Sequence, residues 1–163
     1  MAKILRATLW TVGGLTALAL LGVGAVISTA RTVGAPASLG VNDGRLAPCP
    51  DSPNCVSSQA DPSDRKHFMQ PLAYNGAAAS ALGRIREVIA SQPRAELIVA
   101  QETYLHTVFR SATIGFPDDV EFFVDEQAGL IHFRAAARMG RDDLGVNRAR
   151  MERLSTRLSE VLQ

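Results

Sequence analysis

Histidine, carboxylate and arginine side chains recur at alternate positions in three strand-like stretches of the C-terminal half. Alternate residues of a β-strand point to the same face of its sheet, so these side chains are predicted to share one face. His106 and His132 would supply imidazoles that titrate near neutral pH, beside carboxylates suited to acid–base chemistry. Arg110 and Arg134 would add guanidinium groups that bind anions through paired hydrogen bonds. The residues expected on this polar face are Glu96, Tyr104, His106, Arg110, Asp119, Glu121, Phe123, Asp125, His132 and Arg134.

A solvated sheet surface is the competing interpretation of the same alternation. Antiparallel sheets often expose one face, and opposite charges across strands stabilise a fold by about 0.2–1 kcal/mol per pair. No Gly-x-Ser-x-Gly motif is present and the sequence assigns no base to Ser57 or Ser58, so no catalytic triad is predicted. The cysteines and histidines lack the paired spacing of metal motifs, so neither a metal site nor a cofactor is predicted. His67 is expected to be a packed structural residue.

The elements that position these residues form the order α-β-β-β-β-α. The spacing predicts a helix that begins at Asn75 or Gly76 and ends before Pro93, with Ala78, Ala81, Leu82, Ile85, Val88 and Ile89 on its buried side. Strands are predicted over about 95–101, 103–112, 119–125 and 129–137. Short connections favour an antiparallel four-stranded sheet with both helices on one face, an α+β two-layer sandwich. The face toward the helices is predicted to carry Leu97, Val99, Leu105, Phe109, Val120, Phe122, Val124, Ile131 and Phe133.

A second polar segment precedes the last predicted helix. Asp142 or Asp143 is expected to cap that helix, because a carboxylate accepts hydrogen bonds from its first N–H groups. Arg148 lies early in the helix for a cation, which indicates a specific partner such as Asp143 or Glu121. The later arginines Arg150, Arg153 and Arg157 are predicted to form the solvated face of this helix, on which Val146, Met151, Leu154, Leu158 and Val161 form the apolar side.

Residues 1–30 are predicted to anchor the chain in a membrane. The apolar run from Leu9 to Ala30 reaches the roughly 20 residues that a membrane-spanning helix needs. Lys3 and Arg6 precede it, which favours a cytoplasmic N-terminus and export of everything that follows. The alternative is a signal peptide cleaved after Ala30, although the run is longer than an ordinary signal core. The sequence therefore predicts a single-pass protein of the bacterial inner membrane with its C-terminal domain in the periplasm.

The exported part is predicted to consist of a linker over 31–45 and a domain over 46–163. Cys49 and Cys55 are the only cysteines, and their exported location favours a disulfide over a zinc site. That bridge would staple a Pro-rich arm, residues 46–74, which is expected to lie against the polar face of the sheet. From Arg31 onward the chain carries 15 basic and 16 acidic residues, so its formal charge of −1 argues against nucleic acid as a partner.

Several ordered motifs resemble those of one bacterial family of membrane-associated proteins, the domain-of-unknown-function family 1499. The motifs are Cys49-Pro-Asp-Ser-Pro-Asn-Cys-Val-Ser57, Tyr104-Leu-His106, Phe116-Pro-Asp-Asp-Val-Glu-Phe122, Gly129-Leu-Ile-His-Phe-Arg134 and Asp143-Leu-Gly-Val-Asn-Arg148. The family implies no activity. Its motif residues that fall on the polar face or its rim form the predicted site: His106, Asp119, Glu121, His132, Arg134, Arg138, Asp143, Asn147 and Arg148.

Three functions are compatible with these observations. A binding or accessory module of the cell envelope, with a small molecule or an envelope protein as its partner, requires only the anchor, the stapled arm and the polar face. A small hydrolase or other acid–base enzyme would use His106 and His132 with Asp119 or Glu121, and it requires those side chains to converge in a cleft. A protein–protein interaction domain would instead present a flat surface rimmed by exposed apolar residues such as Phe116 or Phe123.

Overall fold

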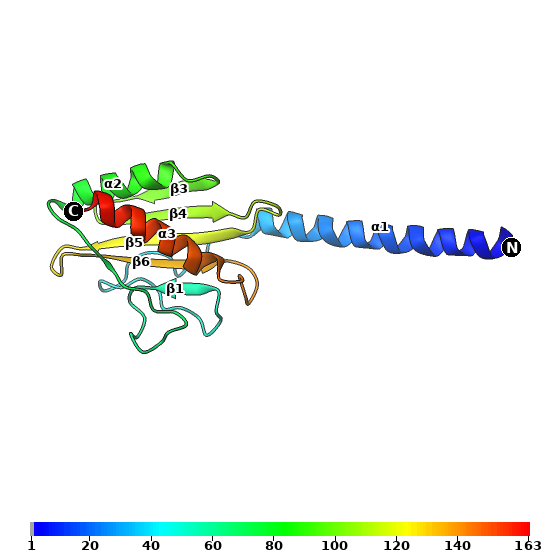
Figure 1. Cartoon of the computed structure of the whole chain (residues 1–163), viewed down its shortest axis with the longest axis horizontal. Helices are drawn as coiled ribbons and strands as arrows, with labels where there is room; N and C mark the ends of the chain where they lie inside the picture. Colours follow the sequence, from blue (N-terminus) through cyan, green and yellow to red (C-terminus); the bar gives the residue numbers. More distant parts are fainter. Residues whose placement is uncertain (1) are drawn as a thin grey trace.

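The computed structural model describes residues 2–163 of the chain and has an α+β fold with a long N-terminal helix. Figure 1 shows this helix, α1, projecting away from the body that holds all the other elements. The elements in chain order are α1 (Ala2–Thr32), β1 (Cys55–Ser57), β2 (Leu72–Ala73), α2 (Ala78–Ala90), β3 (Ala95–Ala100), β4 (Tyr104–Arg110), β5 (Pro117–Asp125), β6 (Leu130–Ala137) and α3 (Val146–Val161).

Helix α1 contains the predicted membrane segment. Its stretch Gly13–Thr32 is long and apolar enough to cross a membrane, and a signal sequence near an N-terminus shares both properties. The side chains of Lys3 and Arg6, on which the predicted orientation depends, lie outside the described part of the structure. The helix is therefore compatible with a single-pass anchor.

The sheet has six antiparallel strands rather than the four predicted. Its order is β1-β6-β5-β4-β3, and β2 pairs with the same edge of β6 as β1 does. The four predicted strands correspond to β3, β4, β5 and β6, whose bounds lie within a few residues of the predicted positions. The two extra strands come from the arm and contain three and two residues, too few for an alternating pattern to be visible in the sequence.

Helices α2 and α3 cover one face of the sheet and enclose the apolar core with it. Every residue predicted for the buried side of α2 is buried. In α3 the apolar side is narrower than predicted, because Val146 and Val161 are exposed while Met151, Leu154 and Leu158 are buried. Arg150, expected in solvent, is also buried.

A β-bulge in β3 changes the predicted faces at that edge strand. The register shifts between Leu97 and Val99, so that Val99 lies opposite His106 rather than opposite a core residue. One extra residue in one strand reverses the facing of the residues beyond it. The assignment of Val99 to the core face was therefore wrong, and Leu97 is partly exposed.

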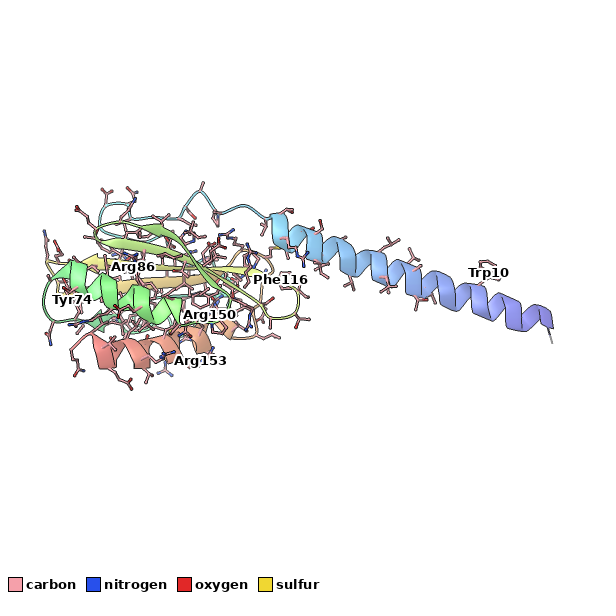
Figure 2. All side chains as sticks on the ribbon, turned by 90° about the horizontal axis from the view of Figure 1, so that it is seen from above. Trp10, Tyr74, Arg86, Phe116, Arg150 and Arg153 are labelled. Carbon is pink, nitrogen blue, oxygen red and sulfur yellow. A yellow bond between two sulfur atoms is a disulfide. The ribbon has the colours of Figure 1, made fainter. Side chains whose placement is uncertain are left out.

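The predicted linker packs on the face of the sheet opposite the helices, as Figure 2 shows. We call residues 33–45 the covering segment. Its turn is well defined, because Asn42 and Arg45 form a β-bridge around Asp43 and Gly44, both of which have positive φ angles. Positive φ at both central residues and an Asp-Gly pair are typical of a type I′ hairpin turn. The polar face is thus covered by the segment that leads to α1.

The disulfide between Cys49 and Cys55 is present, with a Cα–Cα distance of 5.6 Å. Cys55 is fully buried in β1. The arm that follows is held by Arg148 of α3, whose Nη2 donates hydrogen bonds of 3.0–3.2 Å to the carbonyl oxygens of Arg65, Lys66 and Phe68. The partner of Arg148 is therefore the backbone of the arm, and neither Asp143 nor Glu121 as predicted.

Candidate functional site

Glu121 lies at the centre of the polar face and is fully buried. Its Oε1 accepts hydrogen bonds of 2.8 Å from the Tyr104 hydroxyl and from the Gly40 backbone N–H, and Oε2 accepts one of 3.3 Å from Arg134. Register explains the grouping, because β5 places Glu121 between His106 of β4 and Arg134 of β6. One carboxylate therefore joins three strands to the covering segment.

Asp119 forms the second centre of the face. Its Oδ1 is 2.7 Å from His106 Nε2, and both of its oxygens accept hydrogen bonds from Arg138, at 2.7 and 2.8 Å. Burial would raise the pKa of Asp119, but the hydrogen bonds from His106 and Arg138 outweigh burial and hold the pKa below its usual value. Arg138 also donates to the Val33 carbonyl at 3.3 Å, a second tie to the covering segment.

We call His106, Asp119, Glu121, Arg134 and Arg138 the polar cluster. All five are buried or nearly so, and each carboxylate is paired with an arginine. The expectation of a solvated surface was wrong for this part of the face, and so was the expectation that the disulfide arm covers it. The covering segment lies over the cluster and is tied to it through Gly40 and Val33.

His132 does not join the polar cluster. Strand β5 separates it from His106, and the two histidines also differ in register, because His106 lies opposite Glu121 and His132 lies opposite Phe123. Its Nδ1 is 3.2 Å from Ser58 Oγ, and its ring stacks on Phe123. Burial lowers the pKa of His132, with Asp125 opposing and Arg45 adding to the shift. The two histidines therefore have separate partners and do not form one cluster.

Ser58 is a hydrogen-bond partner of His132 that could not be predicted from the sequence. Its hydroxyl also accepts a 2.8 Å hydrogen bond from the Phe133 N–H, and Ser58 N donates to the Phe133 carbonyl at 2.9 Å. These bonds continue the pairing of β1 with β6, so the serine is fixed as part of the sheet edge. The contact between Ser58 and His132 depends on the pairing of β1 with β6, so no local sequence pattern indicates it.

Asp143 and Asn147 hold the start of α3. Gly145 occupies the N-cap position, and the Asp143 carboxylate accepts hydrogen bonds from the N–H groups of Gly145 and Asn147, at 3.1 and 2.7 Å. The Asn147 side chain is buried; its amide donates to the Asn54 carbonyl in the disulfide loop and its oxygen accepts from Arg150. These residues tie the helix to the stapled arm, on the face opposite the polar cluster.

A buried ion pair on the helix face was missed by the sequence analysis. Arg150 Nη2 lies 2.6 Å from Asp118 Oδ2, and its guanidinium stacks 4.8 Å above the Phe109 ring. Burial raises the pKa of Asp118 despite the adjacent arginine. Strand alternation places Asp118 on the core face. A carboxylate at such a position normally indicates that the strand has not yet begun, and its burial is understandable only once its partner, Arg150 of α3, is known.

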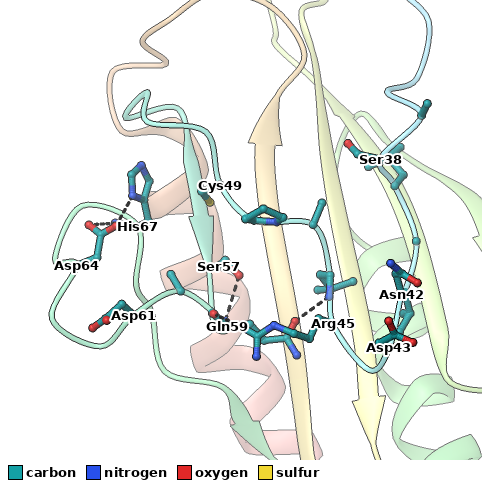
Figure 3. Close-up of a pocket in the computed structure, with 18 residues that line it drawn as sticks. Ser38, Asn42, Asp43, Arg45, Cys49, Ser57, Gln59, Asp61, Asp64 and His67 are labelled. Atoms are coloured by element: carbon teal, nitrogen blue, oxygen red, sulfur yellow. Dashed lines mark hydrogen bonds and ion pairs between the residues drawn. The ribbon is translucent and has the colours of Figure 1, made fainter.

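An open groove of about 900 Å³ lies between the covering segment and the arm (Figure 3). Gln59 joins its two walls: its side chain accepts from Leu46 N at 2.8 Å and donates to the Gly44 carbonyl at 3.0 Å, and its carbonyl accepts from Arg45 at 2.9 Å. The groove also presents Asn42, Asp43 and Asp61 beside apolar residues of the covering segment. None of these was predicted as a site residue.

Asp119 allows a prediction about acid stability. A carboxylate whose pKa is lower in the folded state stabilises the fold above its unfolded pKa, near 3.8, and this stability is lost as the pH falls through the folded value. We expect thermal scans of the full chain in detergent to show a lower Tm for Asp119→Asn at pH 7 and a smaller loss of Tm between pH 5 and pH 3. Glu160→Gln, at an exposed position of α3, is the control and should leave the pH dependence of Tm unchanged. Parallel pH profiles for wild type and Asp119→Asn would contradict the assignment.

Comparison with known proteins places the chain in a family. The model of the family described as "Protein of unknown function (DUF1499)" matches residues 45–158, more than half of the chain, and the chain belongs to this family. A search of curated proteins found no match. The match begins at the last residue of the covering segment and ends within α3.

Proposed function

We propose that this protein is a single-pass inner-membrane protein whose periplasmic domain, residues 46–163, is a binding or accessory module of the cell envelope. The observation that carries the proposal is the open groove between the covering segment and the arm. Ligand sites are commonly concave, roughly 300–1,000 Å³ in volume, and mostly apolar with a few polar groups that orient the ligand. The groove has this volume, and Arg45 and Asn42 supply polar groups.

The geometry disfavours the acid–base enzyme. Its residues would need to converge in a cleft, whereas Asp119 and Glu121 are buried under the covering segment and paired with arginines. A flat interaction surface rimmed by exposed apolar residues has less support, because Phe116 and Phe123, which were expected to form the rim, are partly buried. A polar small molecule of the envelope is therefore the occupant that we favour for the groove.

Native mass spectrometry of the full chain extracted from membranes tests the proposal. We expect a co-purified small molecule on the wild-type protein and its loss from Ala37→Trp, which fills the groove with an indole. Ala79→Trp places the same ring on the exposed side of α2 and is the matched control. A molecule that remains bound to Ala37→Trp at the wild-type level would show that the groove is not its site. A mass that lacks residues 1–30 would show that α1 is a cleaved signal and that the anchor is wrong.

A further inference from the structure

Three arginines line a pocket at the end of the domain where α1 leaves it. The pocket has a volume of about 520 Å³ and is formed by Arg31, Arg94, Arg110, the strand residues Ala95 and Glu96, and the loop over 111–115. Figure 1 shows the loop between β4 and β5 beside the C-terminal end of α1. With Glu96 as the one acidic lining residue, the charged side chains of the pocket sum to +2.

The pocket arginines differ from the buried arginines of the domain in having no carboxylate as an ion-pair partner among the described residues. Arg134, Arg138 and Arg150 each pair with a buried carboxylate. Among the described residues, none of the three pocket arginines forms an ion pair with a carboxylate. The hydrogen bonds of the pocket arginines are to carbonyl oxygens: Arg94 Nε donates to the Arg110 carbonyl and Arg110 to the Gly115 carbonyl, both at 3.3 Å. Their positive charge is therefore available to an external anion.

The loop that forms the rim is held in shape before any ligand binds. Ser111 Oγ accepts hydrogen bonds from the N–H groups of Gly115 and Phe116, at 3.1 and 2.9 Å. Gly115 has a φ of 86°, a conformation that a residue with a side chain rarely adopts. A rim fixed in this way lowers the ordering cost of binding.

The position of the pocket indicates the kind of anion. Arg31 lies in the last turn of α1, at the end of the stretch Gly13–Thr32 that is long enough to cross a membrane. If α1 spans the bilayer, this turn lies at the level of the lipid headgroups. Guanidinium groups bind phosphate through paired hydrogen bonds, and the Debye length of about 8 Å at physiological salt limits the attraction to nearby charges.

We propose that the pocket formed by Arg31, Arg94 and Arg110 binds the phosphate of an anionic phospholipid headgroup. This inference rests on the proposed membrane anchor. The consequence is that the domain has a preferred contact with the membrane surface on the side of the 111–115 loop, in addition to its covalent attachment through α1.

The test compares lipid binding by the full chain in detergent, with phosphatidylglycerol and phosphatidylcholine as probes in native mass spectrometry. We expect Arg94→Gln and Arg110→Gln each to reduce the preference for phosphatidylglycerol by about fivefold, which corresponds to about 1 kcal/mol for a basic residue near an anionic surface. Arg94→Lys and Arg110→Lys keep the charge and should retain most of the preference. Arg153→Gln, on the exposed side of α3, should leave it unchanged.

Three outcomes would overturn the inference. Equal preference in wild type and both Gln variants shows that the pocket does not bind the headgroup. Displacement of phosphatidylglycerol by an equal concentration of inorganic phosphate shows that the pocket is a site for free phosphate. A mature chain that begins after Ala30 removes the anchor, and the inference falls with it. The first two outcomes leave a full-length mass, so they are distinguishable from failure of the proposed anchor.

Discussion

Replacing Glu121 with alanine is expected to lower the free energy of unfolding by about 3–5 kcal/mol, because the change leaves Arg134 as a buried charge without its partner. The same change removes the acceptor for Tyr104 and for the Gly40 N–H. For a domain of this size the loss corresponds to a drop in Tm of roughly 10–20 °C. Thermal unfolding of the full chain in detergent, followed by circular dichroism, measures it.

Hydrogen exchange distinguishes this role of Glu121 from a general loss of stability. The Gly40 amide donates directly to Glu121, so at a temperature where the variant stays folded we expect exchange over residues 37–42 to accelerate more than exchange in α2. Glu160→Ala, at an exposed position of α3, is the control and should change stability by no more than about 0.5 kcal/mol. Equal acceleration in the covering segment and in α2 would contradict a specific tie between the segment and the sheet.

Arg150→Met is expected to have an effect of similar size, about 3–5 kcal/mol, because it leaves the Asp118 carboxylate buried without a cation. The raised pKa of Asp118 shows that burial already disfavours its charged form even with the arginine present. The loss should therefore be smaller at low pH, where Asp118 is protonated. Thermal unfolding of the variant at pH 7 and near pH 4 measures both effects.

A double variant separates the cost of the orphaned charge from the value of the pair. Replacing a buried ion pair by apolar residues of similar volume is often close to neutral, so Asp118→Leu combined with Arg150→Met should recover most of the lost stability. If the double variant is as unstable as the sum of the two single variants, the two side chains do not interact energetically, and the ion pair seen in the structure is not what holds α3 to β5.

Much of the fold could be predicted because its central elements carry strong periodic patterns. Helix α2 has six apolar residues at helical spacing, and the sequences of β3, β4, β5 and β6 alternate over six to nine residues. Where an element is short, the pattern fails: β1 and β2 are recognisable only through their pairing with β6. The bulge at Leu97 and Val99 was missed for a related reason, because one inserted residue does not interrupt an apolar run.

The polar face could be located from the sequence, but its burial could not. Alternation places His106, Asp119, Glu121 and Arg134 on one face, and strand register does bring them together. Whether such a face meets water depends on what lies over it, and the covering segment looked like a flexible linker because it is rich in small residues. The one local signal was the Asp43-Gly44 turn, which is typical of a hairpin and argues for order in that segment.

The ties from Val33 to Arg138 and from Gly40 to Glu121 determine how far the domain could move relative to α1. A freely flexible chain of the same length would let the domain sweep over roughly 20 Å. With both hydrogen bonds in place, the covering segment allows almost no movement between α1 and the sheet. The groove would then keep one fixed position and orientation relative to α1. A binding partner would have to reach the groove at that position, because the domain could not move toward it. Release of the two ties would let the domain move relative to α1 without any change in the groove itself.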